Sequence, residues 1–209
     1  PITSIQKAIT VLGLTQVSNL IKGLSLRKAI GGHELAYEKF WERSDEIATL
    51  SAIIAHKQIA ACNIAVDQAD MAGLLHECGV PILMQRFPEY CKSFRLNQGS
   101  NWPDFNEEDQ HFNTDHTVVG FLVTKHWNLP EFICQAVHFH HDRLNVDHAA
   151  LTLVSILQMA RHLHKEIHRL DDPEWQDIRK QVLEELGVGQ EGSVEFMEDG
   201  LEILTLQQP

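Results

Sequence analysis

Residues 114–141 read TDHTVVGFLVTKHWNLPEFICQAVHFHH, and this stretch decides the class of fold. Thr114 or Asp115 can accept hydrogen bonds from the unpaired N–H groups of a first helix that runs to about Trp127. Pro130 suits the first turn of a second helix, because its missing N–H costs nothing there. The stretch therefore predicts two helices joined by a short turn.

Apolar residues recur at intervals of three and four along the rest of the chain, and no run alternates strictly as a half-buried strand does. We therefore predict an all-α protein. Gly79 is expected to end its helix in a left-handed conformation, and Gly187 lies just past the end of another. Residues 95–108 resemble a loop. The remaining helices are expected over residues 2–13, 17–24, 34–62, 67–78, 149–164, 172–186 and 193–204.

The composition is that of a soluble domain with a sizeable core, because the chain has 209 residues of which 44% are hydrophobic. A formal charge of −12 opposes binding to nucleic acid or to an anionic membrane. The longest apolar stretches fall short of the roughly 20 residues that a membrane span requires. The four cysteines show no C-x-x-C spacing, which favours reduced thiols and a cytoplasmic location. Because the chain starts at Pro1, we expect it to be a fragment or to lack a leading segment.

Histidines are frequent, with 13 in the chain, and some of them fall at the ends of predicted helices. His76 ends one helix, His116 begins another, and His140 and His141 end a third. If these ends meet, imidazole nitrogens beside the Glu77 carboxylate are ligands suited to a divalent metal ion. The alternative is that they are core histidines bonded to backbone carbonyls. Six others are expected on the surface: His33, His56, His148, His162, His164 and His168.

Several motifs together resemble the HDOD domains, which are relatives of the HD phosphohydrolases in bacterial signalling proteins. The motifs are ITSIQKAITVLG (2–13), FWERSDEIA (40–48), GLLHECG (73–79), the stretch 114–141, and LVSILQMARHL (153–163). The resemblance implies an HD-domain-like multi-helix bundle over residues 1–168, followed by a C-terminal helical extension over 169–209. It also implies an N-terminal helical lobe ahead of Ile2, which is largely absent from this chain.

The resemblance further implies a set of metal ligands, and this sequence departs from it. Arg43 matches the first ligand histidine, His76 and Glu77 match the His-Asp doublet, and Arg161 matches the last aspartate to within about one turn. A guanidinium stays protonated and offers no lone pair to a cation. We therefore expect Arg43 or Arg161 to form an ion pair with Glu77, or the two arginines to hold an anion in the former metal cleft.

The histidines at 116, 140 and 141 resemble the additional ligands of dinuclear HD enzymes. With His76 and Glu77 they could form a partial metal site, or they could be remnants packed in the core. No Gly-Tyr-Pro follows Asp142, so the signature of cyclic-dinucleotide phosphodiesterases is absent.

The sequence thus supports two hypotheses about function. The first is a non-enzymatic regulatory domain in bacterial signal transduction that binds other signalling proteins or a small anionic ligand and needs no cofactor. The second is a divergent phosphohydrolase that uses Mn, Fe or Mg. The two arginines at ligand positions favour the first hypothesis, because an enzyme would need carboxylate or imidazole there.

Overall fold

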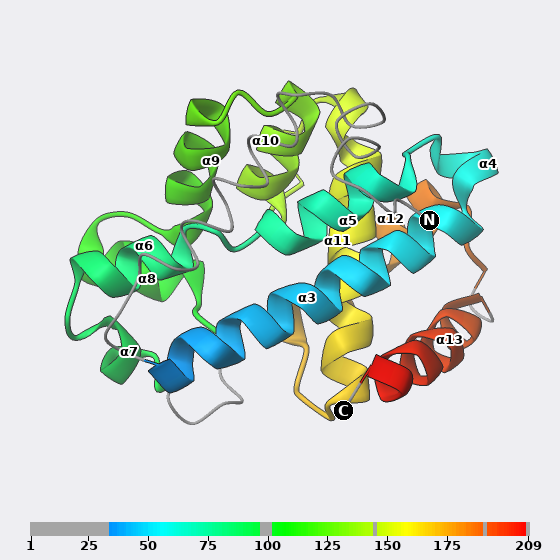
Figure 1. Cartoon of the computed structure of the whole chain (residues 1–209). Helices are drawn as coiled ribbons and strands as arrows, with labels where there is room; N and C mark the ends of the chain where they lie inside the picture. Colours follow the sequence, from blue (N-terminus) through cyan, green and yellow to red (C-terminus); the bar gives the residue numbers. More distant parts are fainter. Residues whose placement is uncertain (1–33, 97–101, 144–145, 190–191, 208–209) are drawn as a thin grey trace, which may run out of the picture.

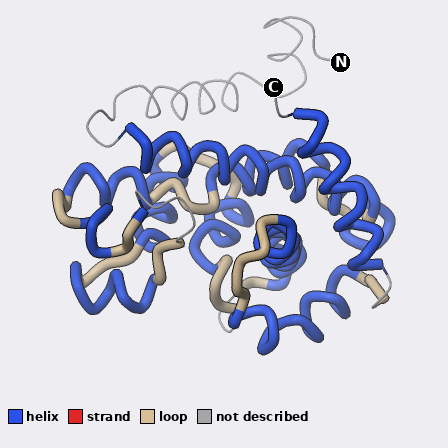
Figure 2. The backbone as a smooth tube through the Cα atoms, turned by 90° about the horizontal axis from the view of Figure 1, so that it is seen from below, coloured by secondary structure: helices blue, strands red, loops and turns tan. Residues whose placement is uncertain are grey.

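The computed structural model describes residues 34–96, 102–143, 146–189 and 192–207, and the helices expected over 2–13 and 17–24 lie outside them. Within these ranges the backbone forms helices, turns and loops but no strand, so the predicted all-α class is confirmed (Figure 2). The helices are α3 (Glu34–Lys57), α4 (Ile59–Cys62), α5 (Val66–Leu75), α6 (Val80–Arg86), α7 (Tyr90–Ser93), α8 (Phe105–Phe112), α9 (His116–His126), α10 (Glu131–Phe139), α11 (His148–Ile167), α12 (Pro173–Leu186) and α13 (Gly192–Gln207).

Two long helices, α3 and α11, cross near the centre of the molecule (Figure 1). Helix α5 packs along α3, α10 packs between α9 and α11, and α12 and α13 cover other sides of α11. Helix α11 appears end-on in Figure 2, with other helices around it. Its apolar side chains explain this position, since Leu153, Val154, Leu157 and Ala160 are fully buried.

The buried apolar residues form two clusters. The larger one includes Ile47 of α3, Ala72 of α5 and Leu157 of α11. The smaller one joins the first turns of α3, through Phe40, to α6 and α7. Because α3 contributes to both clusters, it connects the two parts of the core.

Gly79 departs from the prediction. Its φ of −72° is not left-handed, and it precedes α6 as the N-cap residue. A Cβ at this position would overlap the backbone carbonyl oxygen of His116. Glycine is therefore needed for the close approach of α6 to α9, and the predicted left-handed helix end is wrong. Gly187, by contrast, has a φ of 64° and ends α12 as expected.

Other helix boundaries are confirmed in part. The Asp115 side chain accepts hydrogen bonds from the backbone N–H groups of Thr117 and Val118, as a capping residue should. The helix expected over 34–62 is broken at Gln58, where α3 gives way to α4. The loop expected over 95–108 instead contains the start of α8.

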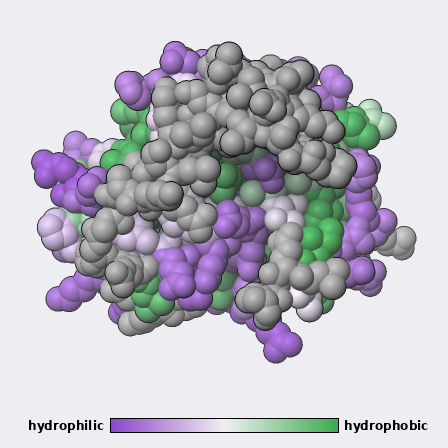
Figure 3. Space-filling view, viewed as in Figure 1, coloured by the Kyte–Doolittle hydropathy of each residue, from purple (hydrophilic) through white to green (hydrophobic). Residues whose placement is uncertain are grey.

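The molecular surface is mixed on the face of Figure 3. Outside the grey atoms, hydrophilic residues lie at the centre of this face and along much of its outline, with smaller hydrophobic patches between them. Among the described residues, no helix has both the length and the apolar character needed to cross a membrane.

Candidate functional site

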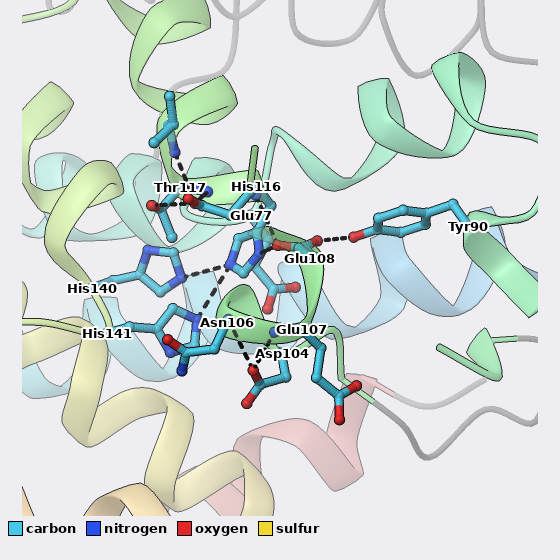
Figure 4. Close-up of polar contacts among 12 residues, drawn as sticks. Glu77, Tyr90, Asp104, Asn106, Glu107, Glu108, His116, Thr117, His140 and His141 are labelled. Atoms are coloured by element: carbon cyan, nitrogen blue, oxygen red, sulfur yellow. Dashed lines mark hydrogen bonds and ion pairs between the residues drawn. The ribbon is translucent and has the colours of Figure 1, made fainter. Parts of the chain in front are cut away.

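The structure brings the predicted site residues together in one buried cluster. His76 and Glu77 lie in the turn between α5 and α6, and His116 is the first residue of α9. His140 and His141 directly follow α10, and the four helix ends meet beside α3 and α11 (Figure 4). The convergence follows from the packing of α9 on α10 and of α10 on α5 and α11.

Arg43 and Glu77 form an ion pair at one end of this cluster. The Arg43 Nη2 atom donates to Glu77 Oε2 at 2.8 Å, and the Glu77 side chain is fully buried. Burial alone would raise the pKa of Glu77, but Arg43 and, to a smaller extent, the neighbouring histidines and Arg161 together hold that pKa below its usual range. Of the two arginines expected to pair with Glu77, it is Arg43 that does so. Arg161 instead donates to Glu174 at 3.2 Å.

Trp102 covers these basic side chains. The centroid of its indole ring lies 4.3 Å from the guanidinium carbon of Arg43 and 5.2 Å from that of Arg161. The Nζ atom of Lys165 lies 5.6 Å from the same ring. Cations at these distances are attracted to the electron-rich face of an aromatic ring. The indole and the Arg43–Glu77 pair thus fill the part of the cluster in which the HD resemblance places metal ligands.

Three imidazoles meet at the other end of the cluster. The Nε2 atom of His116 lies 3.4 Å from that of His140 and 3.2 Å from that of His141. The Nδ1 atoms point outward, each to its own hydrogen-bond acceptor. These acceptors are the Glu108 carboxylate at 2.6 Å, the Val137 carbonyl at 2.7 Å and the Glu174 carboxylate at 2.9 Å. The acceptors therefore orient all three Nε2 atoms toward a common point.

Glu108 is the most completely bonded of these acceptors. One carboxylate oxygen accepts from the Tyr90 hydroxyl, and the other accepts from the backbone N–H and the Nδ1 atom of His116 (Figure 4). All three residues are fully buried. Sequence reasoning missed Glu108 and Glu174, because nothing local in the chain marks a glutamate whose partner lies on another helix.

Burial lowers the pKa of most imidazoles in the cluster and favours their neutral form. It lowers the pKa of His76 to about 4 and, together with Arg161, that of His141 to about 3. Burial and neighbouring cations also hold the pKa of His140 well below its usual range. His116 differs, since burial would lower its pKa but the Glu108 carboxylate raises it. In the metal-free protein, a proton on His116 can therefore serve the hydrogen bonds to both neighbouring imidazoles.

The three imidazoles fit a metal ion of the kind implied by the HD resemblance. Tetrahedral coordination with bonds of about 2.0–2.1 Å separates ligand atoms by roughly 3.3–3.4 Å, close to the separations of the Nε2 atoms from His116. His76 Nε2 and Glu77 Oε1, 4.0 Å apart and buried, have no hydrogen-bond partner among the described residues. Such orphaned atoms are further candidate ligands.

The arginine end does not fit. Arg43 already occupies one oxygen of Glu77, and an Arg161 nitrogen lies 3.5 Å from His141 Nε2. Both guanidiniums would repel a cation. The residues present can therefore hold a metal ion among His116, His140 and His141, while Glu77 groups separately with His76 and His140. They do not supply the whole HD ligand set.

One predicted surface histidine belongs to this region as well. His164 is only 4% exposed, so its expected place on the surface is wrong. It lies on the inner side of α11 one turn beyond Arg161, where Trp102 packs against it with ring centroids 5.4 Å apart. His56, His148 and His168 are exposed as expected, His162 is only partly exposed, and His33 lies outside the described residues.

An all-helical protein with this arrangement of helix ends has the architecture of an HD-like domain. The sequence pattern of the HDOD domain matches residues 1–143. The chain therefore belongs to the HDOD domain family.

Solved structures support the same fold. A candidate signal transduction protein from Marinobacter aquaeolei VT8 is 20% identical with a TM-score of 0.74. The match covers 98% of this chain and 46% of the Marinobacter chain. An HDOD domain protein of unknown function from Geobacter sulfurreducens is 26% identical with a TM-score of 0.58, covering 97% and 76%. A candidate phosphohydrolase from Shewanella amazonensis SB2B is 17% identical with a TM-score of 0.63, covering 98% and 77%.

A sequence relative is longer than this chain. An uncharacterized protein of Treponema pallidum (strain Nichols) is 20% identical over 168 residues, which are 80% of this chain. The match spans about a third of the relative, 32% of its length.

Proposed function

We propose that this HDOD domain is a non-enzymatic regulatory module in bacterial signal transduction, which acts by binding a protein or a small ligand on an HD-like scaffold. The observation that carries the proposal is the buried Arg43–Glu77 ion pair. The pair already neutralises the Glu77 charge at 2.8 Å, which weakens this carboxylate as a metal ligand, and the arginine has no lone pair to offer. The likeness to a candidate signal transduction protein is consistent with this role.

The proposal predicts that the metal-loaded chain does not hydrolyse phosphate esters. The chain is incubated anaerobically with Mn²⁺ and Fe²⁺, and turnover of phosphomonoesters and phosphodiesters is measured. The matched control is the His140→Ala/His141→Ala variant under the same conditions. Turnover of the natural chain should not exceed that of the variant. Metal-dependent turnover that the variant loses would overturn the proposal.

A small anion is the ligand class that the basic residues suggest. Arg43, Arg161 and Lys165 surround Trp102, and displacement of the indole would expose their charges to a phosphate group. Titration calorimetry with inorganic phosphate and nucleotides tests this part separately. Absence of heat at millimolar concentration would exclude the anion and leave a protein partner.

The second candidate function is a divergent metal-dependent phosphohydrolase. The observation that favours it is the spacing of the Nε2 atoms, 3.2 and 3.4 Å from His116 to its neighbours, which suits tetrahedral coordination. A bound metal ion would supply Lewis acidity and a more acidic water. The chain's own contribution is to orient the imidazoles through Glu108 and Glu174 and to keep His140 and His141 unprotonated.

Metal content separates the two candidates. The chain is purified without chelator, loaded as above, and its Mn and Fe are counted per chain by mass spectrometry. Near-stoichiometric metal that disappears in the His140→Ala/His141→Ala variant supports the hydrolase only if turnover accompanies it. Metal without turnover identifies a metal-binding regulatory domain.

A further inference from the structure

A second group of metal-binding side chains lies outside the imidazole cluster described above. Glu46 of α3 accepts hydrogen bonds through one oxygen, Oε2, from His164 Nε2 at 3.0 Å and from His168 Nε2 at 2.7 Å. The three candidate ligand atoms lie within 4.8 Å of one another. Neither the imidazole cluster nor the Arg43–Glu77 pair includes any of these three residues.

The spacing in the sequence suits a metal ion. His164 and His168 are four residues apart at the end of α11, so both imidazoles face the same side, with ring centroids 4.4 Å apart. Two histidines at this spacing with a carboxylate from another element are a recurrent zinc-binding arrangement. Two nitrogens and one oxygen favour a borderline cation over Mg²⁺ or Ca²⁺, which prefer oxygen alone.

The group borders a pocket, which leaves room for a fourth ligand. A cavity of about 220 Å³ lies beside it. Its lining residues are Lys39, Glu42, Arg43, Glu46, Trp102, His164, His168 and Leu170.

The charges around this pocket permit a cation. Lys39 pairs with Glu42 at 2.6 Å and Arg43 pairs with Glu77 at 2.8 Å, so the acidic partners reduce, without removing, the repulsion of these two basic groups for a cation. The whole chain carries a formal charge of −12, which also favours cation binding.

We propose that Glu46, His164 and His168 form a site for Zn²⁺ or a similar transition-metal ion, which bridges α3 and α11 and keeps a coordination position open to the pocket. When the ion binds, each neutral imidazole exchanges its Nε2–H proton for one on Nδ1, so that the Nε2 lone pair coordinates the ion and no net proton is released. The site lies one turn along α3 from Arg43 and one turn along α11 from Arg161. It is independent of whether the domain is an enzyme.

One feature limits the affinity. The Nδ1 atom of His164 is buried and has no hydrogen-bond partner among the described residues. A zinc-bound histidine usually donates this proton to an acceptor, and loss of such a partner weakens binding by about 10- to 100-fold. We therefore expect a dissociation constant on the order of micromolar, weaker than that of structural zinc sites.

Zinc titration of the full chain tests the proposal. Chelator-stripped protein is titrated with Zn²⁺ by calorimetry, and ¹⁵N spectra of the histidines identify the coordinating nitrogens. Glu46→Gln and His168→Ala should each weaken one binding event at least tenfold, and the natural chain should show Zn²⁺-induced shifts of the Nε2 resonances of His164 and His168. Circular dichroism confirms that each variant is folded.

Two controls make the outcome specific. His148→Ala removes an exposed imidazole from the other end of α11 and should leave the titration unchanged. His141→Ala disturbs the imidazole cluster and should also leave this event unchanged. Zinc binding that only His141→Ala weakens, or no binding at millimolar Zn²⁺, would overturn the proposal and show that Glu46 serves only as a hydrogen-bond acceptor.

Discussion

The two ends of the buried cluster differ in how their polar side chains are paired. At one end, Arg43 neutralises Glu77 and the Trp102 indole covers the guanidinium. At the other end, the imidazoles at 116, 140 and 141 keep their Nε2 atoms 3.2–3.4 Å apart across the His116 contacts. At one end a side-chain cation neutralises the buried carboxylate, whereas the other end presents nitrogen donors and the acceptors that orient them.

The comparison teaches that side-chain cations of this chain can neutralise the carboxylates buried at the centre of its fold. Glu77 and Glu174 are both held ionised, because burial would raise their pKa values but Arg43 and Arg161, respectively, lower them. The guanidiniums therefore stabilise carboxylates that would otherwise be costly to bury. We therefore expect the arginine end to contribute mainly to stability and the histidine end to contribute the capacity to bind.

Removal of Arg43 should have the largest effect. Arg43→Met keeps much of the apolar side chain but leaves the fully buried Glu77 carboxylate without its closest cation. Loss of one partner of a buried pair costs about 3–5 kcal/mol. We expect the free energy of unfolding, measured by urea denaturation at pH 7.5, to fall by this amount.

The control for Arg43→Met is the double variant Arg43→Met/Glu77→Gln, which removes both charges. It should recover part of the loss, since a neutral amide is cheaper to bury than a carboxylate. A single variant that unfolds within about 1 kcal/mol of the natural chain would mean that Glu77 is hydrated, protonated or paired with another cation once Arg43 is removed.

Glu108→Ala should have the next largest effect and acts on the histidine end. It leaves three buried donors unpaired: the Tyr90 hydroxyl, the backbone N–H of His116 and its Nδ1–H. We expect a loss of about 2–3 kcal/mol in urea unfolding, because buried unsatisfied donors cost 1–3 kcal/mol each and the site can relax. Tyr90→Phe removes only one donor and should cost about 1 kcal/mol. Equal losses for both variants would show that Glu108 does not orient His116.

The sequence predicted the helices that carry an apolar stripe. Helices α9, α10 and α11 begin within about two residues of their expected starts, because spacing and capping residues are local properties. Helix α8 was missed for a physical reason. Its sequence FNEEDQHF has few apolar residues, and its buried contact is Glu108, which is held by hydrogen bonds from other elements.

The site was predictable to the extent that residue types at helix ends are visible in the sequence. That His76, His116 and the pair at 140–141 meet could be inferred from those ends. The acceptors could not, because Glu174 lies 33 residues from His141 in the chain and only the packing of α12 on α11 joins them. The burial of His164 was missed for the same reason, since it depends on Trp102 and Glu46.

The pH dependence of stability tests whether the buried histidines are neutral in the folded chain. In the chelator-treated protein, the folded-state pKa of His76 is lowered to about 4, below the unfolded value of about 6.5. Between these values the unfolded chain binds more protons than the folded one, so stability is lost as the pH falls from about 6.5 toward 4. This histidine alone should contribute a loss of about 2 kcal/mol between pH 7 and pH 5.

The measurement is the urea midpoint as a function of pH, with His76→Gln as the comparison. The variant should show a shallower dependence over this range, since it lacks the group that must stay neutral in the folded state. His116 contributes a pH dependence of the opposite sign: because Glu108 raises its pKa, its contribution to stability grows as the pH falls. A profile of the natural chain that stays flat from pH 7 to pH 5 would contradict the assignment of neutral, buried imidazoles.

Trp102→Ala should have the smallest effect, and it tests which feature closes the arginine end. The indole contributes cation–π attraction to Arg43 at 4.3 Å and to Arg161 at 5.2 Å, which is worth about 1 kcal/mol at a partly exposed site. The variant should therefore lose about 1 kcal/mol in urea unfolding, well below the loss expected for Arg43→Met. If Trp102→Ala instead lowered the free energy of unfolding as much as Arg43→Met, the packing of the indole would stabilise this end as strongly as the ion pair does. A ligand that displaces Trp102 would then bind more weakly by that whole free energy.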